Sequence, residues 1–169
     1  MNHVVLVGMM GAGKTTLAPL VASRLGLDYC DRDNLVTRQV GIEIAEIVAT
    51  LGEGVFRQAE TQALEVALGR TTTVVVSTGS GVVLSQANRQ SLSDAFVVWL
   101  RATPETLLSR IKDPTSRPML GADPAASLAR LEGERRSFYQ AIAKVVIDVD
   151  AMTEEHTADL VTEAVRQHA

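Results

Sequence analysis

The chain has 169 residues, of which 46% are hydrophobic and 21% are charged, a composition that fits one globular domain with its own hydrophobic core. The net charge of −4 and an aromatic content of 4% argue against a nucleic-acid-binding surface and against binding to an anionic membrane. The single cysteine, Cys30, excludes an intrachain disulfide and favours a cytoplasmic protein, and no stretch is typical of a signal peptide or a membrane-spanning helix.

Short apolar runs rich in β-branched residues alternate with helical stretches along the chain. Strands are predicted at 3–7, 27–30, 73–77, 96–100 and 144–148. Helices are predicted at 14–25, in pieces from about 34 to 69 that break near Gly41 and Gly52, from Pro104 onward, and at 153–167. This order predicts a three-layer α/β/α domain over residues 1–169 with a parallel sheet of about five strands. The stretch of about 112–124, rich in Pro, Gly, Ser and Asp, is predicted to be a short lid.

Residues 8–15, between the first predicted strand and the first predicted helix, match the pattern G-x-x-x-x-G-K-[ST]. Glycines in such a loop let backbone N–H groups turn toward phosphate oxygens, and the N-terminus of the following helix favours anions. Lys14 is expected to contact the β- and γ-phosphates of a nucleotide, and the Thr15 hydroxyl is expected to bind Mg²⁺. The pattern therefore predicts an ATP site, and the alternative is an ordinary glycine-rich turn.

Several polar residues follow the other predicted strands, and each allows two interpretations. Asp33, two residues after Asp31, either faces a hydroxyl acceptor at the edge of the sheet or caps the helix that begins near 34. Arg57 and Glu60, three residues apart, share one face of a helix. They are either functional residues or an ordinary surface ion pair. The glycine-containing segment 79–81 either lets a ligand approach the backbone or forms a plain turn.

Taken together, these motifs resemble those of the shikimate kinases, small P-loop kinases related in fold to nucleoside monophosphate kinases. The resemblance extends from residue 4 to about residue 165, and its carriers are the segments 8–15, 31–33, 56–60, 77–81 and 117–120, and Arg136 with Tyr139. It implies transfer of the γ-phosphoryl group of ATP to the 3-hydroxyl of shikimate, with Mg²⁺ as the cofactor. The expected protein is a monomer with no nucleic-acid or membrane partner.

The resemblance also implies a role for individual residues. The catalytic residues would be Lys14, Asp33 and Arg117, and the metal would be held by Thr15 and Asp31. Further contacts with ATP would come from Gly11, Ala12, Gly13, Thr16 and Arg110. Shikimate would be bound by Asp33, Arg57, Gly79, Ser80, Gly81 and Arg136, with Glu60 orienting Arg57.

Three features depart from the family pattern, one of which is that residues 150–155 do not reproduce a basic or proline-containing adenine loop seen in some members. Ser80 interrupts what is otherwise a run of three glycines, and Val48 stands where the family often has an aromatic residue. The Ser80 side chain either points away from the acceptor ring or points toward it, which would favour a different acceptor. The alternative function is therefore a kinase for another small hydroxy acid or polyol such as gluconate. A nucleotide-binding switch without an acceptor is a more remote alternative.

Overall fold

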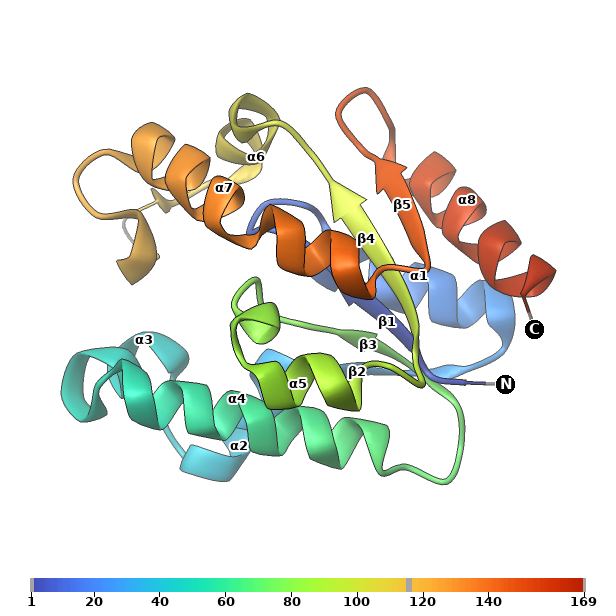
Figure 1. Cartoon of the computed structure of the whole chain (residues 1–169), viewed down its shortest axis with the longest axis horizontal. Helices are drawn as coiled ribbons and strands as arrows, with labels where there is room; N and C mark the ends of the chain where they lie inside the picture. The colour runs from blue at the N-terminus through green and yellow to red at the C-terminus, as the bar shows by residue number, and fades with distance from the viewer. Residues whose placement is uncertain (1, 115–116, 169) are drawn as a thin grey trace.

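The computed structural model describes residues 2–114 and 117–168 and contains a five-stranded parallel sheet (Figure 1). The strands are β1 (Val4–Val7), β2 (Asp28–Asp31), β3 (Val74–Ser77), β4 (Phe96–Arg101) and β5 (Val145–Asp148). Their order in the sheet is β2-β3-β1-β4-β5, and every neighbouring pair is parallel. The predicted parallel sheet is confirmed. The strands that follow β1 in the chain lie on both sides of it, so ligands are expected at the carboxyl ends of the strands beside β1.

Helices cover both faces of this sheet (Figure 1). They are α1 (Lys14–Leu25), α2 (Arg32–Val40), α3 (Ile44–Glu46), α4 (Glu53–Leu68), α5 (Gln86–Ser91), α6 (Pro104–Arg110), α7 (Pro124–Ile142) and α8 (Glu154–Gln167). A π-helical segment lies at Ile47–Leu51, and 3₁₀ turns lie at Val82–Leu84 and Pro118–Leu120. Helices α1 and α8 pack against each other on one face, whereas α5 and α7 lie on the other.

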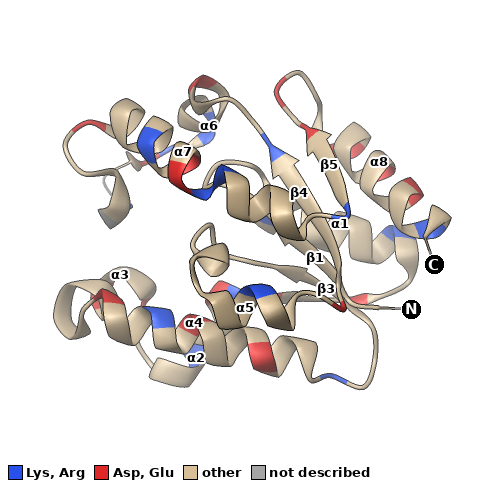
Figure 2. Ribbon diagram, viewed as in Figure 1, with Lys and Arg blue, Asp and Glu red and all other residues tan. Residues whose placement is uncertain are grey.

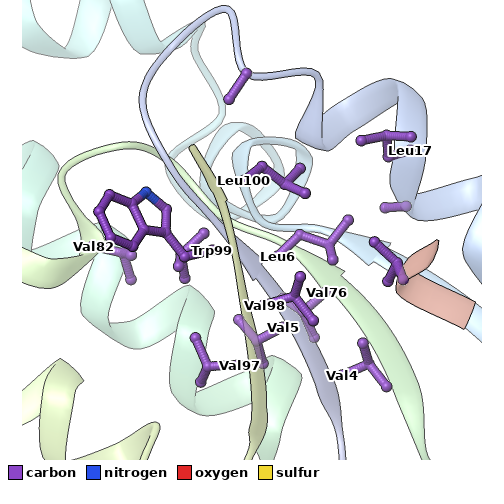
Figure 3. Packing of buried hydrophobic residues seen from close by; sticks show 14 of the residues in the cluster. Val4, Val5, Leu6, Leu17, Val76, Val82, Val97, Val98, Trp99 and Leu100 are labelled. Atoms are coloured by element: carbon purple, nitrogen blue, oxygen red, sulfur yellow. The ribbon is translucent and has the colours of Figure 1, made fainter. Parts of the chain in front are cut away.

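Side chains alternate along β4, so this strand contributes to the core on both faces of the sheet (Figure 3). Trp99 lies on the side of Val82 and stacks on Tyr139 of α7, with ring centroids 5.6 Å apart. The next residue, Leu100, points to the opposite side, toward Leu17 of α1. All four residues of β1 are fully buried, as expected for a parallel sheet covered on both faces.

Several predicted boundaries agree with the structure. Helix α1 spans the predicted residues and ends at Gly26, which adopts a left-handed conformation with φ 67°. The predicted breaks at Gly41 and Gly52 are also present. Helix α5 was not predicted, because its six residues are too few to show an apolar period.

The end of β2 differs from the prediction. Asp31 is the last residue of the strand and Arg32 begins α2, so Asp33 lies in the first turn of a helix rather than on an extended segment. Asp31 Oδ1 accepts hydrogen bonds from the backbone N–H groups of Asp33 at 2.8 Å and Asn34 at 3.2 Å. Asp31 is thus the N-cap, and the interpretation of Asp33 as the cap is wrong.

The predicted lid of about 112–124 includes residues 115 and 116, which lie outside the described residues. On the described part, the backbone N–H of Arg117 donates to the Pro114 carbonyl at 3.1 Å, and Leu120 is fully buried in the core. No helix within the described ranges is long and apolar enough to cross a membrane.

Candidate active site

A cavity of about 910 Å³ is lined by the segments that follow β1, β2, β3 and β5. Its walls also include residues of α4, α6 and α7, and Figure 2 shows basic and acidic residues along α4 and α7. The basic lining residues are Lys14, Arg32, Arg57, Arg110, Lys112, Arg117 and Arg135. The acidic ones are fewer, namely Asp33, Glu43, Glu53, Glu60 and Glu154. A chain of negative net charge therefore gathers positive charge in one cavity, which suits anionic ligands.

The phosphate-binding loop needs glycine for both conformation and space. Gly8, Gly11 and Gly13 have φ values of 144°, 84° and 93°, which other residues rarely adopt. A Cβ atom on Gly8 would lie 2.5 Å from the Leu100 carbonyl oxygen, and one on Gly11 would lie 2.6 Å from the Leu107 carbonyl oxygen. The loop is therefore built against β4 and α6, and a plain turn would not require this fit.

Lys14 lies buried within this loop. Its Nζ donates hydrogen bonds to the carbonyl oxygens of Gly8 at 2.8 Å and Met9 at 2.7 Å. Burial lowers the pKa of Lys14 to about 7, although the nearby Asp33 carboxylate opposes the shift and the Arg32 guanidinium adds to it. An ammonium group that is destabilised by burial gains from an anionic ligand, so this position favours a phosphate group.

We therefore expect ATP binding to be coupled to proton uptake at Lys14. With a pKa of about 7, Lys14 is partly neutral in the free protein above pH 7, and phosphate oxygens would raise that pKa. The affinity for ATP should consequently fall as the pH rises above about 7. Calorimetry in buffers of different ionisation enthalpy measures the uptake, and Lys14→Arg, which stays charged, should lack it. Equal uptake by both proteins would contradict the assignment to Lys14.

Glu60 joins two arginines on the other side of the cavity. Its Oε2 accepts a hydrogen bond from Arg57 Nη1 at 2.5 Å, and its Oε1 accepts one from Arg32 Nη1 at 2.5 Å. Burial lowers the pKa of Arg57, but the Glu60 and Glu53 carboxylates together outweigh this effect, and the pKa of Arg57 is raised overall. Because Glu60 is buried, the Arg57–Glu60 pair is part of the cavity wall, and its interpretation as a surface ion pair is wrong.

The glycines of the 79–81 segment make room for these arginines. A Cβ atom on Gly79 would lie 1.8 Å from Arg32 Nη2, and one on Gly81 would lie 2.0 Å from Arg57 Nη1. Both glycines line the cavity. The segment is therefore more than a turn, since side chains at 79 and 81 would displace the arginines.

The structure corrects the position of one predicted arginine. Arg136 is not among the residues that line the cavity; its side chain is 56% exposed and pairs with Glu132 at 2.9 Å. Arg135 lies in the cavity wall instead and is 1% exposed. The reason is helical phase, because Arg135 shares the buried face of α7 with Leu131 and Tyr139, and Arg136 is turned about 100° away.

Ser80 lines the cavity, and its side chain is held by an arginine of α7. Its Oγ accepts a hydrogen bond from Arg135 Nη1 at 2.9 Å, while its carbonyl oxygen accepts one from the Tyr139 hydroxyl at 2.6 Å. Burial raises the pKa of Tyr139, so its hydroxyl remains a donor. Two residues one turn apart on α7 thus fix the 79–81 segment.

The remaining predicted residues divide into two groups. Those that line the cavity, as expected, include Ala12, Thr15, Thr16, Asp33, Arg110 and Arg117. Arg110 also donates from Nη2 to the Val149 carbonyl at 2.6 Å, which joins α6 to the segment after β5. Val48 lines the cavity too. Asp31 does not, since it is engaged as the helix cap.

Two site residues, Arg32 and Arg135, were missed. The signal for Arg135 was present, because its spacing of four residues from Leu131 and from Tyr139 places it on the apolar face of a helix. Arg32 has a similar spacing from the buried Val36, but an arginine directly after the predicted strand gave no reason to expect burial.

The sheet, the glycine-rich loop with its lysine, and the basic pocket beside it define a P-loop kinase fold and site. The shikimate kinase family model matches residues 10–166. The chain is 44% identical to a shikimate kinase of Synechococcus sp. (strain JA-3-3Ab), over 88% of this chain and 79% of that protein. It is 36% identical to one of Marinomonas sp. (strain MWYL1), over 98% of this chain and 93% of that protein.

A similar solved structure is that of shikimate kinase from Acinetobacter baumannii in complex with shikimate. The TM-score is 0.94 at 30% identity, with 99% of this chain and 94% of that chain covered. The chain belongs to the shikimate kinase family, whose members are ATP-dependent kinases.

Proposed function

We propose that this protein transfers the γ-phosphoryl group of ATP to the 3-hydroxyl of shikimate, giving shikimate 3-phosphate and ADP in aromatic amino acid biosynthesis. The observation that carries the proposal is the buried Arg135. Among the described residues no carboxylate lies within ion-pair distance of its guanidinium, and burial lowers its pKa. The carboxylate of shikimate would supply the missing negative charge, because a buried cation needs a partner.

The proposed binding of ATP, the phosphoryl donor, depends on Lys14 and Thr15. Mg²⁺ prefers one or two protein oxygens together with phosphate oxygens, and the Thr15 hydroxyl at the cavity wall fits this requirement. We assign Thr15 as a ligand of the ion, and the ion would neutralise phosphate charge. Asp31 caps α2 and does not line the cavity, so we assign it only to the outer shell of the ion. Lys14 would leave its loop carbonyls to contact the β- and γ-phosphates, and Arg110 would lie along the adenine.

On the acceptor side, Asp33 would accept a hydrogen bond from the attacking hydroxyl and take its proton as the new O–P bond forms. The bond between the γ-phosphorus and the β–γ bridging oxygen breaks, and ADP leaves. Arg117, exposed at the cavity edge, would approach the transferring group and stabilise its charge. Because the transition state is loose, positioning and charge neutralisation provide most of the catalysis.

One assay tests the proposal against its alternatives. ADP release should require shikimate and should be slow with gluconate or without an acceptor. The family model and both curated relatives are shikimate kinases, so the comparisons do not favour the gluconate alternative. Release with gluconate but not with shikimate would overturn the proposal, and nucleotide binding without any turnover would indicate a switch.

Neighbouring arginines on α7 provide a matched pair of variants. Arg135→Lys should raise KM for shikimate about 10-fold or more, because an ammonium group cannot reproduce the two-pronged contact of guanidinium with a carboxylate. Arg136→Lys, at an exposed position, should leave KM within about twofold of the native value. Steady-state kinetics at saturating ATP measure both. A larger effect at Arg136 would restore the assignment made from the sequence.

The proposal also includes the monomer as the active form and the cytoplasm, which supplies ATP, as its location.

A further inference from the structure

Arg32 has no role in the mechanism above, although it occupies the centre of the acceptor side. It is the first residue of α2, directly after the capping Asp31. Its side chain is 1% exposed, and yet it lines the cavity, with its guanidinium in the space that Gly79 leaves open. Burying an arginine to this degree is costly unless its charge is paired.

The Arg32 guanidinium pairs with two carboxylates at once. Its Nη2 forms an ion pair with Asp33 Oδ1, and its Nη1 donates to Glu60 Oε1 at 2.5 Å. The other oxygen of Glu60 binds Arg57. Charges of alternating sign therefore run from Asp33 through Arg32 and Glu60 to Arg57.

Asp33 depends on this arrangement for its position. Its side chain is 47% exposed, and within the described ranges its carboxylate forms an ion pair only with Arg32. If this contact were lost, the carboxylate could adopt other rotamers in the water-accessible cavity. Arg32 itself cannot rotate, because Glu60, Gly79 and the Phe56 ring, 5.9 Å from its guanidinium carbon, surround it.

We propose that Arg32 is a positioning residue, which holds the Asp33 carboxylate toward the acceptor hydroxyl and links it through Glu60 to Arg57. This inference rests on the proposed function, since it gives Asp33 the role of contacting the hydroxyl. A planar guanidinium donates hydrogen bonds to two carboxylates in fixed directions. A lysine ammonium at the same place lacks this fixed geometry.

A double-mutant cycle tests this coupling. Arg32→Lys should lower kcat for shikimate about 10- to 100-fold, the range for a misplaced catalytic group, and should leave KM for ATP unchanged. In the Asp33→Asn background the same substitution should lower kcat by less than about twofold, because the group that it positions is already lost. Arg101→Lys is the matched control, since Arg101 pairs with Asp148 through two contacts outside the cavity and should keep native kinetics.

Two outcomes would overturn the inference: native kcat in a folded Arg32→Lys protein, or equal losses of kcat in both backgrounds, which would indicate a purely structural role. Thermal unfolding checks that each variant is folded, and Arg32→Gln, which keeps a hydrogen-bond donor, replaces Arg32→Lys if the latter is not. The proposed function fails separately, if the native protein releases no ADP with shikimate.

Discussion

Lys14→Ala is expected to lower kcat about 100-fold or more, a loss of about 3 kcal/mol of transition-state stabilisation. The substitution removes the only lysine of the phosphate-binding loop, whose charge would follow the migrating phosphoryl group. It also removes the hydrogen bonds from Nζ to Gly8 and Met9, so a moderate decrease in thermal stability is expected as well.

The two effects of Lys14→Ala can be separated. Kinetics at saturating ATP and shikimate give kcat, and thermal unfolding gives the change in stability. Lys144→Ala, at an exposed position on the segment before β5, is the control and should change neither quantity. Turnover near the native rate by a folded Lys14→Ala protein would contradict the assignment of Lys14 to the transferring phosphate.

Asp33→Asn is expected to lower kcat about 100-fold while leaving the melting temperature nearly unchanged, because the amide cannot accept the hydroxyl proton. The structure strengthens this expectation, since Asp31 and not Asp33 caps α2. The helix therefore keeps its cap in the variant. Only the ion pair with Arg32 is weakened, and the buried guanidinium of Arg32 keeps Glu60 as its charged partner, so the loss of stability should be small.

The control for Asp33→Asn is Asp123→Asn. Asp123 caps α7 outside the cavity, where its Oδ1 accepts a hydrogen bond from the Ala126 backbone N–H at 3.1 Å. Asn caps helices about as well as Asp, so this variant should keep both stability and activity. A marked loss of stability in Asp33→Asn, with activity retained, would show that Asp33 serves the fold and not the reaction.

Local sequence was sufficient to predict the framework and the donor side. The strand-to-helix context of residues 8–15 identified the phosphate-binding loop, because its glycines and its lysine act within one short segment. Helix α1 was predicted at its observed bounds for the same reason, since Gly26 ends it through a contact with its own last turn. Interactions between near neighbours in the chain can be recognised from the order of residues alone.

The acceptor side depends on contacts between distant segments, and here the sequence alone was insufficient. The rotation of α7 about its axis places Arg135, and not the adjacent Arg136, in the cavity wall. The bond from Arg135 to Ser80 spans 55 residues, and that from Arg32 to Glu60 spans 28. Which arginine is buried, and what neutralises it, follows from the packing of α2, α4 and α7 around the carboxyl end of β3. Residue order and periodicity do not give the spatial arrangement of these helices, so only the tertiary structure decided which arginines line the cavity.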